Sequence, residues 1–408
     1  MKKFLSILCF LTITLPAFSD SEFQPGQAKV TASVLNIRNI ASSGGEVIGA
    51  VKRGDLVNVI ERSKAQSTIG DIRDYWYKIK FTDKKTEKTG WLFGGYLSFE
   101  LNMESGLRWK NLSPAGSQKL SAIAVSDSGE VYVGTEQGSL LVTSDKGKTW
   151  KKIIPQALGV NIGRINKILF SGKSVLIAAY GSDQGGVWKS ANGGNSWTQL
   201  TVSQGLASNF VFDVAKSLDG DIYAATDKGV SLSKDEGTTW MPLSKHELKT
   251  NSLCVQIQPS GRVFMGTAMG LYTFQDVKGI FKSEKKWVRI AEKAPNMGNL
   301  VVTMAASSTG DIFVGTNKGL NRASEKNTDA WYGIGGQSPV NDILIENPSG
   351  RIIVATDNGL NISLDNGTSW ATYKKENGLA SNKVTKIAVN KKDNMIWIIS
   401  EDAVSFHE

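Results

Sequence analysis

A short apolar strand that usually ends in threonine recurs along the chain, and this repeat restricts the fold more than any other feature. Its copies are Val131–Thr135, Leu176–Tyr180, Ile222–Thr226, Val263–Thr267, Ile312–Thr316, Ile352–Thr356 and Ile396–Ser400. Their last residues are separated by 45, 46, 41, 49, 40 and 44 positions, a mean near 44. A period in the forties with several short strands in each unit is typical of a β-propeller. Almost no segment has helical periodicity, which excludes helical repeats of similar length.

Each unit is predicted to contain four strands, named A to D here, with polar turns between them. In the unit that starts at Phe210, the strands are Phe210–Lys216, Asp221–Thr226, Val230–Ser233 and Thr239–Leu243. The turns contain the Asp-Gly and Lys-Gly pairs that suit tight reversals of the chain. The sequence therefore predicts small antiparallel sheets, one for each repeat.

The two ends of the repeat array supply incomplete units that fit together. Six complete sets begin at Leu120, and the last stretch, Val384–Phe406, supplies only strands A to C. The segment Leu107–Leu112 precedes the first set and has the composition of a strand D. Pairing the strand of Trp109 with Val404–Phe406 completes a seventh blade and removes an open sheet edge. We therefore expect residues 106–408 to form a seven-bladed propeller closed by both ends of the array.

The turn between strands C and D carries the strongest local motif, Ser/Thr-x-Asp/Asn-x-Gly-x-Ser/Thr-Trp, with degenerate copies ending at Trp287 and Trp331. This motif resembles the Asp-box, or BNR repeat, of sialidases, sortilin-type receptors and photosystem assembly propellers. The acid is expected to accept N–H groups of its own turn, and the glycine to adopt positive φ. The tryptophan is expected to pack between blades. We favour this structural interpretation over a ligand or metal site for Asp145, Gly147, Trp150, Asn192, Gly194, Trp197, Asp235, Gly237, Trp240, Asp365, Gly367 and Trp370.

A second motif lies on two connections from strand D to strand A. Gly-Leu-Ala-Ser-Asn occurs at residues 205–209 and again at 378–382, and after the first copy Asp219-Gly220 and Thr226–Val230 follow. This arrangement resembles the propeller repeat of two-component regulators, a family that senses or binds outside the cytoplasm. No membrane helix or kinase follows here, so the signalling role is not expected.

The N-terminus has the pattern of a secretory signal peptide. Lys2 and Lys3 precede the apolar stretch Phe4–Thr14, which is too short to span a bilayer, and Ala17 and Ser19 suit a cleavage site. We predict a signal peptide over residues 1–19, a polar linker over 20–27, and a periplasmic or secreted protein. Lipidation at Cys9 is a less favoured alternative, and no later run reaches the ~18 apolar residues of a membrane span.

Cysteine, histidine and charge exclude several classes of function. The full chain holds only two Cys and two His, so a His/Cys metal site is not expected, and Cys254 alone remains after cleavage. Without a partner Cys254 forms no internal disulfide and is predicted to be a small buried side chain. The chain has a net charge of +9, but the basic residues are dispersed, which argues against nucleic-acid binding.

The segment before the repeats, residues 28–100, is predicted to form a small all-β barrel. Short alternating strands are separated by turns that contain Gly, Asp and Lys. Leu35–Arg38, Val47–Gly49, Trp76–Ile79 and Gly90–Leu92, with Tyr96-Leu97, resemble the bacterial SH3 (SH3b) domain in the right order. The resemblance implies recognition of cell-wall peptides or proteins in an aromatic groove, with Trp76 and Trp91 as candidate lining residues.

The barrel also departs from the family pattern. Asn39-Ile40-Ala41 replaces the usual Ser-Gly-Pro, and the insertion Ser63–Asp74 is longer than usual.

Three functional classes remain: a binding protein, an enzyme and a purely structural scaffold of the cell envelope. The Asp-box is also found in sialidases, so a glycoside hydrolase of that type is the alternative. Two observations argue against a sialidase-like site: the Arg-Ile-Pro segment is absent, and Arg262 and Arg351 fall in separate turns around the ring. A two-carboxylate hydrolase stays open, because distance in space is not legible in sequence. No HExxH, GxSxG or phosphate-binding loop occurs. We expect an exported binding or scaffold protein of the cell envelope, not an enzyme, with no cofactor and no metal.

In propellers the D-to-A and B-to-C loops share one face around the channel mouth. The longest such loops, Pro155–Arg164 and Tyr180–Gly186, break the repeat most, and departures from a repeat favour function. Candidate ligand contacts on this face are Arg164, Asn166, Tyr180, Asp183, Asn209 and Phe210. The expected partners are a cell-wall peptide or an envelope protein, with a glycan as a further possibility. The basic barrel is predicted to localise the protein and the propeller to bind the partner.

Overall fold

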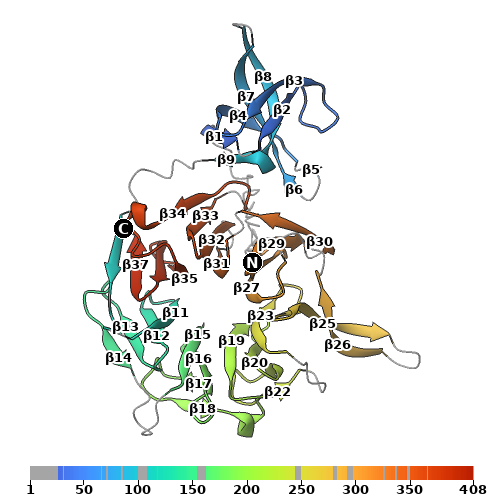
Figure 1. Ribbon diagram of the computed structural model, residues 1–408. Helices are drawn as coiled ribbons and strands as arrows, with labels where there is room; N and C mark the ends of the chain where they lie inside the picture. Colours follow the sequence, from blue (N-terminus) through green and yellow to red (C-terminus); the bar gives the residue numbers. More distant parts are fainter. Residues whose placement is uncertain are drawn as a thin grey trace, which may run out of the picture.

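The chain is described by a computed structural model over most of its length. The described residues are 26–30, 32–65, 67–69, 72–83, 86–99, 108–116, 118–153, 162–243, 250–278, 283–291, 297–324, 327–335, 338–346, 350–364 and 366–407. The predicted signal peptide, residues 1–19, lies outside them, as does most of the predicted linker. The predicted all-β class is confirmed: strands form a small barrel beside a ring of sheets (Figure 1).

The barrel is built around one seven-stranded sheet with the order β3-β2-β8-β7-β4-β1-β9. Its strands are β1 (Gly26–Val30), β2 (Val34–Arg38), β3 (Val47–Lys52), β4 (Leu56–Arg62), β7 (Trp76–Asp83), β8 (Thr86–Phe93) and β9 (Leu97–Phe99). Side chains alternate as a strand requires, so in β2 Leu35 and Ile37 are buried while Val34 and Asn36 are exposed. The buried set forms one core with Ile79.

The insertion that departs from the SH3b pattern folds as a separate hairpin of β5 (Ser67–Ile69) and β6 (Ile72–Asp74). Strand β6 lies against the short 3-10 helix η1 (Gly94–Tyr96) and against β30 of the propeller. The extra length therefore contributes to the contact between the barrel and the ring (Figure 1).

The described part of the ring contains seven four-stranded antiparallel sheets. Blades 1 to 3 are β11 (Leu120–Val125), β12 (Val131–Thr135), β13 (Leu140–Thr143), β14 (Lys151–Ile153); β15 (Arg164–Ser171), β16 (Ser174–Tyr180), β17 (Gly186–Ser190), β18 (Thr198–Leu200); and β19 (Val211–Lys216), β20 (Ile222–Thr226), β21 (Gly229–Ser233), β22 (Met241–Pro242). Blades 4 and 5 are β23 (Ser252–Ile257), β24 (Val263–Thr267), β25 (Gly270–Lys278), β26 (Ser283–Ile290); and β27 (Val301–Ala306), β28 (Ile312–Thr316), β29 (Gly319–Ser324), β30 (Asn327–Ile334). Blade 6 is β31 (Val340–Glu346), β32 (Arg351–Thr356), β33 (Gly359–Ser363), β34 (Ala371–Tyr373), and blade 7 contains β35 (Val384–Asn390), β36 (Met395–Ser400) and β37 (Ala403–His407). Two further 3-10 turns, η3 (Val202–Gln204) and η4 (Lys375–Asn377), precede blades 3 and 7.

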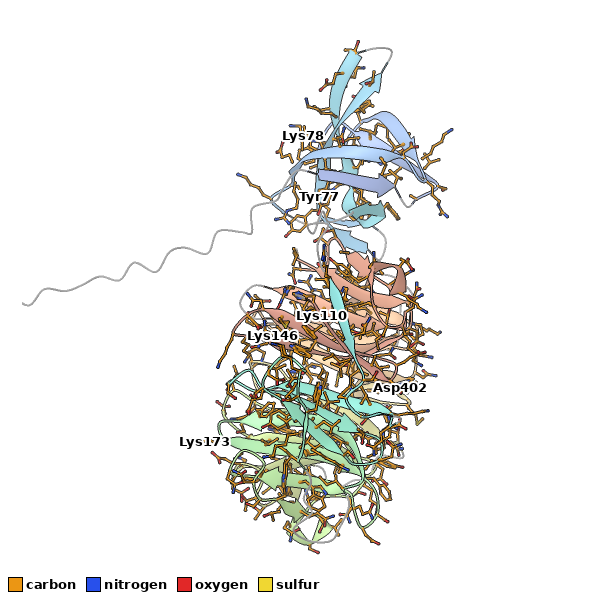
Figure 2. The ribbon with its side chains drawn as sticks, turned by 90° about the vertical axis from the view of Figure 1, so that its left-hand side faces the viewer. Tyr77, Lys78, Lys110, Lys146, Lys173 and Asp402 are labelled. Atoms are coloured by element: carbon orange, nitrogen blue, oxygen red, sulfur yellow. The ribbon has the colours of Figure 1, made fainter. Side chains whose placement is uncertain are left out.

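The last sheet joins the two ends of the array. Strand β10 (Trp109–Leu112) pairs antiparallel with β37, and the register places Trp109 opposite His407. The Trp109 side chain is 8% exposed, and its ring lies 6.1 Å from Tyr373 and 5.7 Å from His407 between centroids. Figure 2 shows Lys110 on this strand at the side of the ring. The first strands of neighbouring blades contact one another around the axis, including β35 and β11 across the closure.

The turns between strands C and D are held by their own side chains. In blade 3 the Asp235 carboxylate accepts the N–H of Thr239 at 2.8 Å and its hydroxyl at 2.6 Å, as well as the Ser233 hydroxyl at 2.8 Å. The glycine of this turn, Gly237, has φ +82° and would place a Cβ 2.7 Å from Leu176 of blade 2. Trp240 closes the hairpin in the core shared by blades 2 and 3. Blades 1 and 2 repeat the arrangement at Asp145 and Asn192, whereas Asp365 lies outside the described residues.

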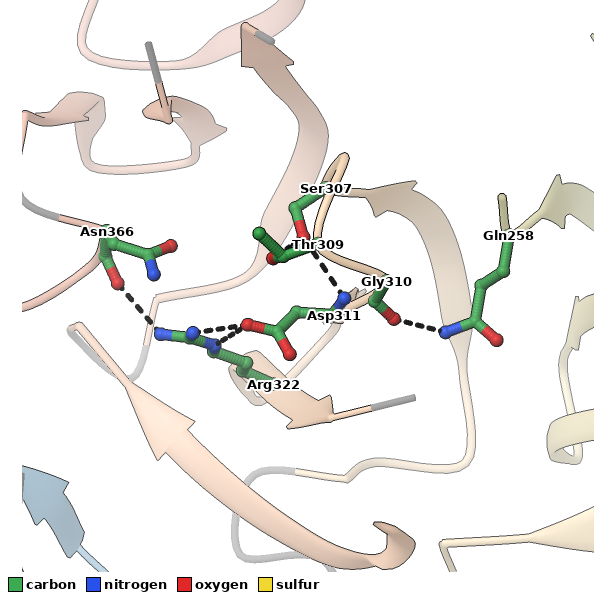
Figure 3. Close-up of polar contacts among 7 residues, drawn as sticks. All are labelled: Gln258, Ser307, Thr309, Gly310, Asp311, Arg322 and Asn366. Carbon is green, nitrogen blue, oxygen red and sulfur yellow. Dashed lines mark hydrogen bonds and ion pairs between the residues drawn. The ribbon is translucent and has the colours of Figure 1, made fainter. Parts of the chain in front are cut away.

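At the A-to-B turns, hydrogen bonds from side chains join neighbouring blades (Figure 3). The amide of Gln258 in blade 4 donates to the carbonyl of Gly310 in blade 5 at 2.6 Å. Arg322 of blade 5 is paired with Asp311 and donates to the carbonyl of Asn366 in blade 6 at 2.9 Å. These hydrogen bonds connect one blade to the next, whereas the backbone hydrogen bonds of each sheet stay within a single blade. They therefore hold neighbouring blades in position relative to one another.

Candidate functional site

The mouth of the channel is surrounded by the starts of the A strands and the ends of the B strands. In blade 3 the buried hydroxyl of Thr226 donates to the carbonyl of Gly229 at 2.8 Å and accepts the N–H of Lys228 at 3.1 Å. The two bonds fix a tight turn between strands B and C. Blades 4, 5 and 6 repeat them at their own threonines.

Blade 2 lacks this pair of hydrogen bonds, because it has no threonine at the position. The strand register places Ala179 where blades 1 and 3 to 6 have the threonine and blade 7 has a serine, so Tyr180 lies one residue beyond that position. The repeat interpretation that ended this copy at Tyr180 is therefore shifted by one residue. Alanine has no hydroxyl to close a tight turn, and strands β16 and β17 are joined instead by residues 181–185.

The loop 181–185 is held in place by hydrogen bonds from its surroundings. The amide of Asn209 donates to the carbonyl of Ser182 at 2.8 Å. Gln199 donates to the carbonyl of Asp183 at 2.7 Å, and the indole N–H of Trp188 to that of Gln184 at 3.2 Å. The loop is thus a fixed part of the mouth, and a partner that binds there orders little additional backbone.

An aromatic cluster projects beside this loop. Tyr180 is 41% exposed, and its ring centroid lies 4.9 Å from that of Phe210 and 5.2 Å from that of Phe212. Arg164 is opposite Tyr180 in the β15–β16 register, is half exposed, and pairs with Glu136 of blade 1 at 3.4 Å. We name Arg164, Tyr180, Phe210 and Phe212 the mouth cluster. It offers a large apolar contact area with a cation at its edge.

The structure separates the predicted ligand contacts into two groups. Arg164, Tyr180 and Phe210 come together in the mouth cluster, and Asp183 is exposed on the neighbouring loop. The amides of Asn166 and Asn209 are used by the fold: Asn166 donates to the carbonyl of Val211 in blade 3 at 2.9 Å, and Asn209 accepts the N–H of Val202 at 3.0 Å. The loop Pro155–Arg164 lies mostly outside the described residues.

Sequence reasoning missed Phe212, because its exposure follows from an irregularity in the sheet. Every A strand in the ring has a shift in register near its start, where one extra residue is accommodated. Phe212 occupies this position in blade 3, between Val211 and Asp213. A bulge turns a side chain away from the direction that strict alternation predicts.

The same shift places one polar residue of each of several blades around the channel. The residues that follow it include Lys167, Asp213, Cys254, Asp342 and Lys386, from blades 2, 3, 4, 6 and 7. Their charges interact across the channel, since Lys167 is influenced by both Asp213 and Asp342. Burial lowers the pKa of Lys167, but these two carboxylates outweigh it and hold the pKa above its ordinary value. Burial raises the pKa of the Cys254 thiol well above its usual range.

The two channel carboxylates are bound by backbone amides. Asp213 accepts the N–H of Val255 in blade 4 at 3.0 Å, and Asp342 accepts the N–H of Ile387 in blade 7 at 3.0 Å. Burial raises the pKa of Asp213, although Lys167 and the backbone donors oppose this. Each carboxylate therefore connects one blade to the next.

In the barrel the two candidate tryptophans have different environments. Trp76 is 1% exposed and packs edge-on against Phe93 at 5.5 Å, which leaves it no surface for a ligand. Trp91 is half-buried, and the ammonium of Lys78 lies 5.6 Å from its ring centroid. Lys78 is labelled on the barrel in Figure 2 and pairs with Glu61 at 3.1 Å. Trp91 is thus the accessible member of the predicted pair.

Among the described residues no group of three or more His, Cys, Asp or Glu side chains is arranged to hold a metal ion. Nor do they include a helix with the length and apolar character needed to cross a membrane.

Comparison with known proteins supports both parts of the chain. Residues 33–98 match the model of the bacterial SH3 domain family, so the barrel is an SH3b domain. None of the curated proteins matches the chain. The solved structures that resemble it are β-propellers, and the chain is an SH3b domain followed by a propeller.

Four of these structures illustrate the range. YCF48 from Cyanidioschyzon merolae is 17% identical over 74% of this chain and 98% of its own, with a TM-score of 0.54. YCF48 bound to D1 peptide is 17% identical over 76% of this chain and 98% of its own, with a TM-score of 0.57. The extracellular domain of the putative hybrid two-component system BT3049 from B. thetaiotaomicron is 17% identical over 74% of this chain and 42% of its own, with a TM-score of 0.60. PorZ is a surface component of the type-IX secretion system of Porphyromonas gingivalis. It is 13% identical over 82% of this chain and 56% of its own, with a TM-score of 0.57. At these identities the likeness shows the fold.

Proposed function

We propose that this protein is an exported, non-enzymatic binding protein of the cell envelope. The SH3b domain attaches it to the cell wall or to an envelope protein, and the propeller binds a peptide segment of a partner protein at the mouth cluster. The observation that carries the proposal is the exposed Tyr180, supported by Phe210 and Phe212 beside a fixed loop.

The mouth cluster has the properties of an interface hot spot. Exposed aromatic rings and arginine supply much of the binding energy in protein interfaces, because they bury large areas with few rotatable bonds. Here Tyr180 lies against two phenylalanine rings and the loop beside it is already hydrogen-bonded. Binding therefore costs little conformational entropy. The structural relative YCF48 has been solved with a peptide, which supports this class of partner.

The non-enzymatic part of the proposal rests on the carboxylates of the channel. A glycoside hydrolase needs two carboxyl groups that are free to protonate the substrate and to attack it or activate water. Asp213 and Asp342 are both occupied by backbone N–H groups of the following blade. Their positions are explained by the fold.

The attachment role of the barrel rests on its charge and on Trp91. Residues 28–100 hold 12 Lys and Arg against 8 Asp and Glu. Trp91 is half-buried beside the cation of Lys78. Envelope polymers are anionic, and exposed charges attract them over roughly 8 Å at physiological ionic strength. We expect the isolated barrel to sediment with peptidoglycan at low salt and less at high salt. If the isolated propeller sediments and the isolated barrel stays in solution at both salt concentrations, the propeller attaches the protein and the proposed role of the barrel is refuted.

The peptide site is tested by selection from a random peptide library displayed on phage. The wild-type chain is expected to enrich a set of peptides, and Tyr180→Ser is expected to lose them. Leu218→Ser is the matched control, because Leu218 is 82% exposed in the A-to-B turn at the other end of the same blade. Equal enrichment by the wild type and by Tyr180→Ser would refute the assignment of the mouth cluster.

A further inference from the structure

A cavity lies where the SH3b domain meets the ring. It has a volume of about 600 Å³, and its wall is formed by η1 of the barrel together with blades 5 and 6. Figure 1 shows the barrel beside β30, β33 and β34. The hairpin of the SH3b insertion contacts β30 and η1 at the same junction. Two domains therefore contribute to one cavity, which is partly open to solvent and separate from the mouth cluster in blades 2 and 3.

The accessible wall of this cavity combines neutral hydroxyl and amide groups with the half-buried apolar side chain of Ile334. Asn358 and Thr372 are exposed and Asn361 is half-buried, and all three line the space. Apolar residues such as Val340 and Val354 also reach the wall, but they are 2% exposed and belong to the core of the blades. A ligand with many hydroxyl and amide groups fits this wall, because a wholly apolar ligand would leave the exposed hydroxyl and amide groups without hydrogen-bond partners.

Trp370 and the barrel supply flat surfaces to the cavity. The indole N–H of Trp370 is already donated to the carbonyl of Gly367 at 3.1 Å, so the ring offers the cavity mainly an apolar surface. Gly94 and Gly95 of the barrel also line the cavity and contribute backbone without side chains. An aromatic face next to hydroxyl and amide groups suits a sugar ring, which has an apolar face and a polar edge.

One cation completes the site. Lys374 is half-buried at the wall, and no acidic side chain accompanies it among the described lining residues. A cation without an acidic neighbour in a neutral polar site favours a ligand with a carboxylate.

We propose that the cavity between the SH3b domain and blades 5 and 6 binds a short oligosaccharide that carries a carboxylate. The sugar ring lies against Trp370, its hydroxyl and acetamido groups bond with Asn358, Asn361 and Thr372, and its carboxylate pairs with Lys374. The site is independent of the peptide face. It makes the position of the barrel on the ring part of glycan recognition.

The test uses calorimetry on the chain from residue 20 onward with two sugar probes. One is a peptide-free tetrasaccharide of alternating N-acetylglucosamine and N-acetylmuramic acid, and the other is chitotetraose, which has the same backbone without carboxylates. The acidic probe is expected to bind more tightly. Lys374→Ala is expected to weaken the acidic probe about tenfold, the loss of one charge-assisted hydrogen bond, and to leave chitotetraose unchanged.

Three further variants make the outcome decisive. Lys375→Ala removes the same charge from the neighbouring exposed residue outside the cavity and is expected to change neither affinity. Thr372→Val is expected to weaken both sugars. Tyr180→Ser is expected to leave both unchanged, so failure of the peptide proposal and failure of this one are distinguishable.

The proposal is overturned if neither sugar binds, or if Lys375→Ala weakens the acidic sugar as much as Lys374→Ala. It is also overturned if an acidic peptide of equal charge binds in place of the sugars and is weakened by Lys374→Ala, because the cavity is then a peptide site.

Discussion

Replacing Trp109 by alanine tests whether strand β10 holds the ring closed. Its side chain is 8% exposed and belongs to the core shared by blades 6 and 7, with Tyr373 and His407 beside the ring. A tryptophan buries about 150–250 Å², and at ~25 cal/mol per Å² this gives an upper bound of about 4–6 kcal/mol. Because the unfolded chain already buries part of this area, we expect a loss of about 3–4 kcal/mol.

The assay is a thermal melt followed by near-UV circular dichroism, with urea unfolding beside it. A loss of this size is expected to lower Tm by roughly 6–10 °C. Lys110→Ala, on the exposed face of the same strand, is the control and is expected to stay within ~0.5 kcal/mol of the wild type. Deletion of residues 106–113 is expected to lower Tm further. If both Trp109→Ala and the deletion melt with the wild type, β10 does not hold the ring and the closure argument is refuted.

Three further predictions concern the turns and the channel. Asp235→Ala is expected to cost about 1–2 kcal/mol in urea unfolding, a small value for several hydrogen bonds because the carboxylate is exposed, while peptide selection is unchanged. Hydrogen bonds from Thr149 hold the pKa of Asp145 at about 2, and those from Thr239 lower the pKa of Asp235 as well. Carboxylates with lowered pKa stabilise the fold above the unfolded pKa of ~3.9, so the difference between wild type and Asp235→Ala is expected to shrink as pH falls from 6 to 2.5, and an unchanged difference would contradict this. Cys254 is expected to react with a thiol reagent only as fast as the chain unfolds, and rapid labelling of the native protein would show that the channel is open to it.

The repeat in the sequence was enough to place the strands, because each blade uses the same turns at nearly equal spacing. It failed by one residue in blade 2, where Ala179 takes the threonine position and Tyr180 was aligned in its place. The error has a physical cause, since apolar character alone marks a strand but the hydroxyl marks where its turn begins. The missing threonine hydroxyl at Ala179 also marks the irregular loop 181–185, on which the candidate site depends.

The candidate site itself was only partly predictable. Arg164, Tyr180 and Phe210 were found because they interrupt the repeat, but Phe212 lies at a bulge and Asp213 follows it, and alternation does not reveal that bulge. Asn166 has a side chain suited to ligand binding, yet its amide donates a hydrogen bond to the carbonyl of Val211 in the neighbouring blade. The cavity beside Lys374 could not be predicted, because it requires the position of one domain on the other.

The pairing of β10 with β37 also determines the order in which this protein becomes complete. Ser405 donates its hydroxyl to Asn111 across this pair at 2.6 Å, although the two residues are 294 positions apart in the sequence. Contacts between such distant residues form late, because a long loop must close before they contribute. Blades 1 to 6 are formed from residues that are close in sequence, so each can assemble as its own segment becomes available. The seventh must wait for the end of the chain, and until then β10 presents an unpaired edge. A chain stopped short of Phe406 therefore keeps a ring of well-formed blades that stays open and prone to pair with another copy of itself.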